Sequence, residues 1–102
     1  MLSAPVSERG QLIAQAVEDQ WYEKKGARVS AQTLGQALVA FANAEGGLVV
    51  VGVQGGVVQG MTRQGIRQIN SLRQASIDHA VPPVRYSCSD VGCINADGHE
   101  DF

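Results

Sequence analysis

The chain of 102 residues is poor in aromatic residues and in cysteine. Aromatic side chains make up 5% of the sequence, so a core must be built largely from Val, Ala, Leu and Ile. The two cysteines, Cys88 and Cys93, are too few for a disulfide framework. No apolar run is long enough to span a membrane, and residues 1–20 lack the pattern of a secretory signal. These absences predict a cytoplasmic protein of one domain that makes no contact with a membrane.

The net charge of −2 gives no sign of a strongly basic surface. However, the charges are unevenly distributed along the chain. Residues 90–102 contain four acidic residues and no Lys or Arg, whereas residues 1–89 contain eight basic and six acidic residues. The body of the protein is therefore mildly basic, which is compatible with contacts to phosphate groups.

Apolar residues at spacings of three and four predict three helices. The clearest is Ala31–Asn43, whose apolar face carries Leu34, Leu38 and Phe41. A first helix follows Ser7, with an apolar stripe between Leu12 and Val17. A third runs from Arg63 to about His79 and should bury Ile66, Ile69 and Leu72. Ser7, Ser30 and Thr62 are the expected N-caps.

Extended segments alternate with these helices. Leu48–Val53 has no polar side chain, which is typical of a strand with both faces buried. The glycines in Gln54–Gly56 predict a hairpin turn into a strand at Val57–Met61. Shorter or weaker segments are expected at Trp21–Lys24 and Val84–Ile94. The predicted fold is a single α/β (α+β) domain, with a mixed sheet of about four to five strands flanked by two to three helices.

The last predicted feature is a turn at Asn95–Gly98, which only four residues follow. A turn that reverses a strand should lead into a partner strand, and the sequence suggests none. We therefore expect that residues 1–102 form one domain lacking its last strand or strands. Alternatively, the segment Val84–Ile94 pairs with a second copy and forms a homodimer.

Two segments carry a resemblance to a known family. Ala40–Gly47 (AFANAEGG), followed by Val51–Val53, resembles the A-F-A-N-x-x-G-G signature of the Schlafen-type AlbA-like domain. Glu18–Lys25 (EDQWYEKK) is similar to its acidic strand motif, E-x-E-x-x-E-F-K. Weaker likenesses follow in family order at Val57–Met61 and at Ile77-Asp78 with Pro82-Pro83, so the resemblance covers roughly residues 12–98. It implies an α/β nucleic-acid-binding domain of the kind found in bacterial regulators.

The resemblance also raises the question of catalysis. Some vertebrate members of that family are RNA endonucleases that act on transfer RNA and use three surface acids. Glu18 and Glu23 match the first two acids, but Gln54 stands where the third would fall. Three carboxylates could bind divalent metal ions that activate water, and a neutral amide is a weaker ligand. We therefore expect no catalysis and no cofactor, and a metal-dependent ribonuclease using Glu18 and Glu23 is the disfavoured alternative.

Basic residues supply the candidate contacts to DNA or RNA. Arg63 and Arg67 should share one helix face at i, i+4, and Trp21 and Tyr22 beside the other candidates could add one stacking ring. His79, Cys88, Cys93 and His99 do not have the spacing of a common zinc site. The sequence thus favours a non-catalytic nucleic-acid-binding domain with a role in transcription regulation, and an oligomerisation or structural module is the other alternative. The candidate contacts are Lys24, Lys25, Arg28, Arg63 and Arg67.

Overall fold

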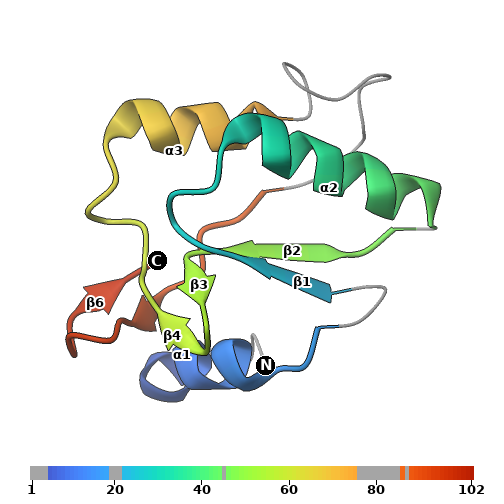
Figure 1. Ribbon diagram of the computed structural model, residues 1–102. Helices are drawn as coiled ribbons and strands as arrows, with labels where there is room; N and C mark the ends of the chain where they lie inside the picture. Colours follow the sequence, from blue (N-terminus) through green and yellow to red (C-terminus); the bar gives the residue numbers. More distant parts are fainter. Residues whose placement is uncertain (1–4, 19–21, 45, 76–85, 87) are drawn as a thin grey trace.

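The computed structural model describes residues 5–18, 22–44, 46–75, 86 and 88–102 (Figure 1). These residues contain helices and short strands in one α/β domain, which confirms the predicted class. None of the helices in this part of the chain is long and apolar enough to cross a membrane. In chain order the elements are α1 (Val6–Gln15), β1 (Tyr22–Lys25), α2 (Ala31–Asn43), β2 (Leu48–Val51), β3 (Val53–Gln54), β4 (Val57–Val58), α3 (Ile66–Arg73), β5 (Cys93–Ile94) and β6 (Glu100–Asp101).

The strands form three separate pairs. β1 and β2 are parallel, with Tyr22 opposite Leu48 and Lys25 opposite Val51. β3 pairs with β4, and β5 with β6, both antiparallel. Parallel and antiparallel pairing therefore both occur, as expected. However, the described residues form three two-stranded sheets where one sheet of four to five strands was expected.

Gly52 is the main reason for this division. Its φ of +109° bends the chain between β2 and β3, in a backbone region that L side chains rarely adopt. Its N–H donates to the Lys25 carbonyl at 2.8 Å, and its carbonyl accepts from the Gln59 N–H at 2.7 Å. The prediction of one buried strand over Leu48–Val53 was therefore wrong. β2 is also less covered than expected, since Leu48 is 46% exposed.

The predicted hairpin is confirmed. Gly55 and Gly56 have φ values of +60° and +76°, and two positive values at the tip are typical of a type I′ turn. β4 is shorter than the expected Val57–Met61, because the chain leaves the hairpin at Gly60. The Met61 N–H instead donates to the Phe102 carbonyl at 2.8 Å.

Of the three predicted helices, α2 has the predicted bounds. The Ser30 hydroxyl accepts from the Thr33 N–H at 3.1 Å, which confirms the N-cap. α1 begins earlier than predicted, because its N-cap is Pro5 and Ser7 lies within the helix. α1 buries Ile13 and Ala14. Leu12 and Val17, the two ends of the expected apolar stripe, are exposed, so the stripe was predicted wrongly at these two residues.

α3 begins at Ile66, three residues later than predicted. Its N-cap is Gly65, and the Thr62 hydroxyl donates instead to the Asp101 carboxylate at 2.6 Å. Arg63 therefore precedes the helix, and the expected i, i+4 helix face with Arg67 does not form. His79, the predicted end of this helix, lies outside the described residues.

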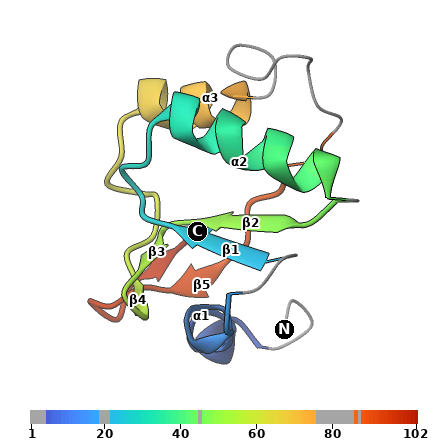
Figure 2. The same ribbon diagram turned by 45° about the vertical axis from the view of Figure 1, so that its right-hand side comes forward.

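The helices lie on opposite sides of the β1–β2 pair. Figures 1 and 2 show α2 and α3 together on one side, with α1 and the β3–β4 hairpin on the other. α1 can approach β5 closely at Gly10, where an added Cβ would lie 3.1 Å from the Ile94 carbonyl oxygen. Each side has its own buried cluster. The α1 side contains Ile13, Ala14, Val53, Val58 and Cys93, and the α2–α3 side contains Ala27, Leu34, Met61, Leu72 and Ala75.

The turn near residue 95 does have a partner strand. β6 pairs with β5, with Cys93 opposite Asp101 and Ile94 opposite Glu100. The expectation that this turn leads to no partner was therefore wrong, because two of the four remaining residues are enough to form the short ladder. Within the predicted segment Val84–Ile94, residues 84, 85 and 87 lie outside the described part.

Candidate nucleic-acid interface

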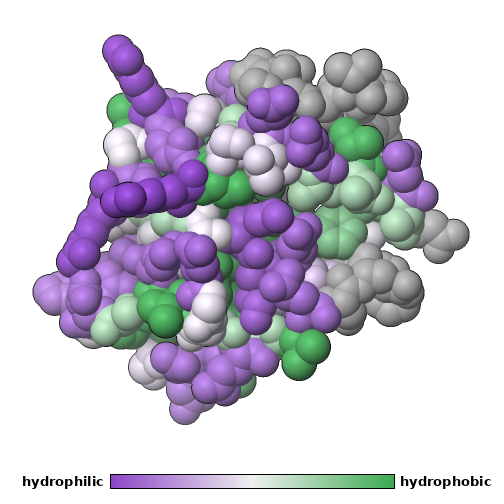
Figure 3. Space-filling view, viewed as in Figure 1, coloured by the Kyte–Doolittle hydropathy of each residue, from purple (hydrophilic) through white to green (hydrophobic). Residues whose placement is uncertain are grey.

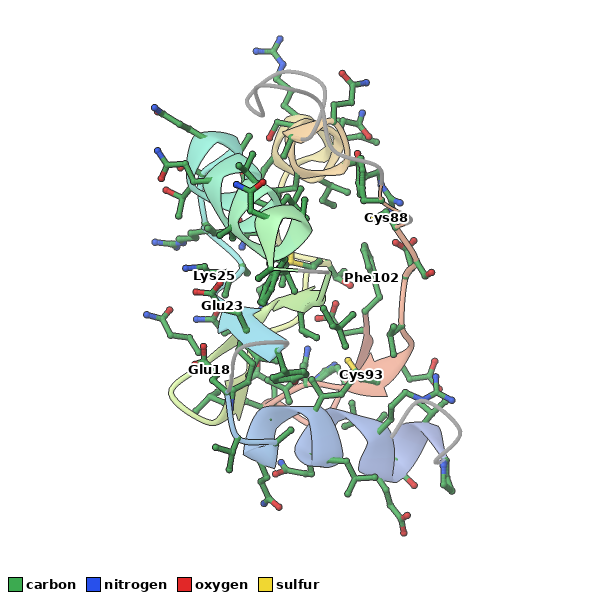
Figure 4. All side chains as sticks on the ribbon, turned by 90° about the vertical axis from the view of Figure 1, so that its right-hand side faces the viewer. Glu18, Glu23, Lys25, Cys88, Cys93 and Phe102 are labelled. Atoms are coloured by element: carbon green, nitrogen blue, oxygen red, sulfur yellow. The ribbon has the colours of Figure 1, made fainter. Side chains whose placement is uncertain are left out.

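An open pocket of about 340 Å³ lies where β1 ends and the β3–β4 hairpin turns. Glu18 and Gln54 both line it. Gln54 stands where the family resemblance places the third acid of the nuclease members. Figure 4 shows Glu18, Glu23 and Lys25 following one another along the same side of the molecule. The pocket is lined by Glu18, Lys24, Lys25, Gly26, Val53, Gln54, Gly55 and Gly56.

Hydrogen bonds fix the hairpin against the end of β1. The Gln59 carboxamide accepts from the Ala27 N–H at 2.7 Å and donates to the side-chain oxygen Oε1 of Gln54 at 3.3 Å. Gly26 leaves the space for this arrangement, since an added Cβ would lie 2.7 Å from the Gln54 Oε1 atom. The polar group that the hairpin presents to the pocket is therefore the neutral amide of Gln54, which the Gln59 amide holds in place.

The two candidate acids have different surroundings. Glu23 forms an ion pair with Lys25, with 2.9 Å between Oε1 and Nζ, and both side chains are partly buried. Glu18 is exposed and close enough to Tyr22 to affect that phenol. Burial raises the pKa of Tyr22, and the negative charge of Glu18 raises it further. The Tyr22 hydroxyl donates to the Ile13 carbonyl at 2.9 Å, so this ring belongs to the interior and is not a stacking surface.

No metal centre is evident in the part of the chain that the structure describes. There, His, Cys, Asp and Glu side chains do not form a group of three or more that could hold an ion. Cys88 is exposed and Cys93 is buried, and both are free thiols. Burial raises the pKa of the Cys93 thiol. Of the other two residues considered for a metal, His79 lies outside the described residues and His99 is exposed.

Lys24 has a structural role that the sequence analysis missed. Its ammonium donates to the carbonyls of Ala14 and Ala16, at 2.9 Å and 2.7 Å. These carbonyls lie at the C-terminal end of α1, where a positive charge is favourable. Since side chains alternate along a strand, Lys24 points away from its neighbours Glu23 and Lys25. The sequence gives no local signal for this contact, because the residues are eight and ten positions apart.

Gln68 brings two of the candidate arginines onto adjacent segments. Its carboxamide donates to the Ala27 carbonyl at 3.3 Å and to the Val29 carbonyl at 2.8 Å. These two carbonyls flank Arg28, and Gln68 directly follows Arg67 on the first turn of α3. Both arginines are exposed, and neither takes part in an ion pair among the described residues.

Arg63 lies on the segment before α3, four residues ahead of Arg67 in the chain. It is 78% exposed and forms an ion pair with Asp97, with 2.6 Å between Nη2 and Oδ2. Figure 3 shows strongly hydrophilic side chains gathered over the start of α3 and the loop before α2. We refer to Arg28, Arg63 and Arg67 as the arginine edge. All three are among the contacts predicted from the sequence, although the helix face expected for Arg63 and Arg67 does not form.

A family model described as Schlafen, AlbA_2 matches residues 18–98, which include the pocket and the arginine edge. Neither a search of curated proteins nor a search of solved structures found a matching protein.

Proposed function

The chain belongs to the Schlafen AlbA_2 family, and on that premise we propose that it binds nucleic acid without cutting it. Domains of this family are in general nucleic-acid-binding or nuclease-like. The finer proposal is that this chain is the nucleic-acid-binding domain of a cytoplasmic bacterial regulatory protein that acts on transcription. Either DNA or RNA would supply the phosphates.

The observation that best supports binding is the pair of hydrogen bonds from Gln68. They hold the loop that carries Arg28 against the helix that carries Arg67, so two exposed guanidinium groups lie on neighbouring segments. Arginine donates in a fork that suits phosphate oxygens. Arg63 would join them when phosphate competes with Asp97 for its guanidinium group.

The two lysines among the proposed contacts are weaker members of the surface. Lys25 is already paired with Glu23, and Lys24 uses two of its three N–H donors on α1. A phosphate near the pocket would contact Lys25 only by competing with that carboxylate. We therefore expect the arginine edge to contribute more to affinity than the lysines.

The contacts of Gln54 and Glu23 support the proposal that the protein does not cut nucleic acid. Gln54 supplies no charge to hold a divalent ion, and Glu23 is engaged by Lys25. The alternative ribonuclease would need Glu18 and Glu23 to hold that ion between them. Incubation of the protein with transfer RNA and Mn²⁺ or Mg²⁺ tests it, and we expect the RNA to stay intact. Cleavage that is lost in Glu23→Ala would show that the protein is a nuclease.

The alternative of an oligomerisation or structural module has lost part of its support. It invoked an unpaired strand ending at Ile94, and Cys93 and Ile94 pair within the chain to Asp101 and Glu100. A homodimer remains a separate proposal. Light scattering coupled to size-exclusion chromatography tests it directly.

Fluorescence anisotropy with labelled DNA and RNA tests the proposed binding. The test variant is Arg28→Gln/Arg67→Gln, and its control is Ser7→Glu/Gln11→Glu. Each double variant lowers the net charge by two, but the control places its changes at exposed positions on α1, away from α3 (Figure 1). Loss of the two arginines should weaken binding and lower the slope of log Kd against log salt by about 1.4 to 1.8. An equal loss in the control would mean that only net charge matters.

A further inference from the structure

Ile66 is exposed where the sequence predicts a buried residue. It is 75% exposed, whereas Ile69 and Leu72 on the same helix pack against the α2–α3 cluster. Helix geometry accounts for the difference. At 100° per residue, Ile66 lies about 120° around the helix from Leu72, and therefore off the buried face.

Basic residues lie near Ile66 in the chain. Arg67 follows it directly, Arg63 lies three residues before it, and Gln68 holds the Arg28 loop against the same turn. Figure 3 shows a small hydrophobic spot among the hydrophilic side chains over the start of α3. An apolar side chain beside arginines suits a ligand that carries both negative charge and apolar surface. Nucleic acid has both, in its phosphates and in the faces of its bases.

We propose that Ile66 packs against an exposed base, and that the arginine edge binds single-stranded nucleic acid. This inference rests on the proposed function and specifies its ligand. In a duplex the faces of the bases are stacked on one another, and mainly their polar edges are accessible. In a single strand the base faces are open to apolar side chains while the phosphates reach the nearby arginines.

The contact has a recognisable thermodynamic signature. Phosphate contacts release counterions, so their loss changes the salt dependence of binding. Apolar packing on a base releases no counterions. Removal of the Ile66 side chain should therefore weaken binding without changing the slope of log Kd against log salt, whereas removal of Arg67 should change both.

The test variant is Ile66→Ser, and the matched control is Val17→Ser. Val17 is also an exposed aliphatic residue, at 84%, and it follows α1. Because both side chains are exposed, we expect both variants to keep the wild-type unfolding midpoint. The probe is a labelled single-stranded oligonucleotide of about 20 nucleotides, measured as a single strand and as a duplex.

For Ile66→Ser we expect the Kd for the single strand to rise about 3- to 10-fold, with an unchanged salt slope. The Kd for the duplex should change less than about twofold, and Val17→Ser should match the wild type. An unchanged single-strand Kd in Ile66→Ser would overturn this proposal while leaving binding through arginine intact. Equal losses on single strand and duplex would overturn the preference for single strands. If the wild type binds no probe at low salt, both this proposal and the proposed function are wrong.

Discussion

Asp101 should make the stability of this domain sensitive to acid. Its Oδ1 atom accepts hydrogen bonds from Met61 N, Thr62 N, Thr62 Oγ1 and Phe102 N, at 3.0, 2.9, 2.6 and 2.7 Å. Its Oδ2 atom accepts from Asn95 Nδ2 at 3.0 Å. The carboxylate thus connects β6 to the segment that leads into Arg63 and α3. Loss of its charge would weaken the support of the arginine edge as well as the fold.

Burial alone would raise the pKa of Asp101. The hydrogen bonds from Thr62, Asn95 and Phe102 outweigh burial and hold that pKa well below its ordinary value of 3.8. The stabilisation is therefore fully present above the ordinary pKa and is lost as the pH falls through 3.8 toward the folded-state value.

The variant Asp101→Asn estimates the size of this effect. It has the same shape but no charge, and its amide group would face the Asn95 amide, donor against donor. Hydrogen bonds to a charged group are each worth about 1.5 to 3 kcal/mol, and partial exposure reduces that value. We expect Asp101→Asn to lower the free energy of unfolding by about 2 kcal/mol at neutral pH, which is a large part of the stability of a small domain.

Urea unfolding followed by circular dichroism measures this difference at about pH 7 and about pH 3. Other acids titrate in the same range, so the informative quantity is the gap between wild type and Asp101→Asn. The gap should be largest at neutral pH and should shrink in acid, because the unfolded wild type takes up a proton on Asp101 as the pH falls through 3.8 while the folded state resists it. The variant has no titrating group at this position. A gap of the same size at both pH values would refute the assigned role of the carboxylate.

Two further predictions concern residues next to this carboxylate and next to the arginine edge. Gly60→Ala should destabilise the domain by about 2 kcal/mol or more in the same urea assay. The residue has a φ of +74°, and the new Cβ would collide with the Asp101 carboxylate. A loss of less than about 0.5 kcal/mol would contradict this prediction. Asp97→Asn should tighten nucleic-acid binding and make that binding more dependent on salt, because the variant releases Arg63 from its ion pair. Weaker binding of this variant in fluorescence anisotropy would contradict the prediction.

Local patterns predicted several elements correctly. α2 follows from an N-cap serine and an apolar face, and both signals lie within the helix itself. The β3–β4 hairpin was predictable from its two adjacent glycines, because a tight turn of this type needs two residues with positive φ and glycine adopts positive φ readily. The family resemblance was confirmed by the match over residues 18–98.

The errors come from contacts between distant residues. Six consecutive positions without a polar side chain suggested one strand. Gly52 divides it, because its N–H donates to the Lys25 carbonyl and its carbonyl accepts from the Gln59 N–H. Thr62 resembled an N-cap, yet its hydroxyl bonds to Asp101, 39 residues away. Such pairings depend on how the whole chain packs, and no local pattern encodes them.

The candidate site shows the same division. Arg28 was proposed as a phosphate contact for its charge, and Arg67 also for a helix face shared with Arg63 that does not form. Both contacts stay predictions. Their segments are held together by Gln68, a polar residue whose importance is visible only once its two backbone partners are known. Lys24 was selected for its charge, and the structure adds a role in capping α1.

The salt dependence of nucleic-acid binding tests the central claim most directly. The measurement is fluorescence anisotropy of a labelled single-stranded oligonucleotide with the wild-type chain at about 50 and 200 mM salt. Our account predicts binding at the lower salt that weakens steeply at the higher salt, and more steeply than for Arg28→Gln/Arg67→Gln. The absence of binding by the wild type at about 50 mM salt would contradict it.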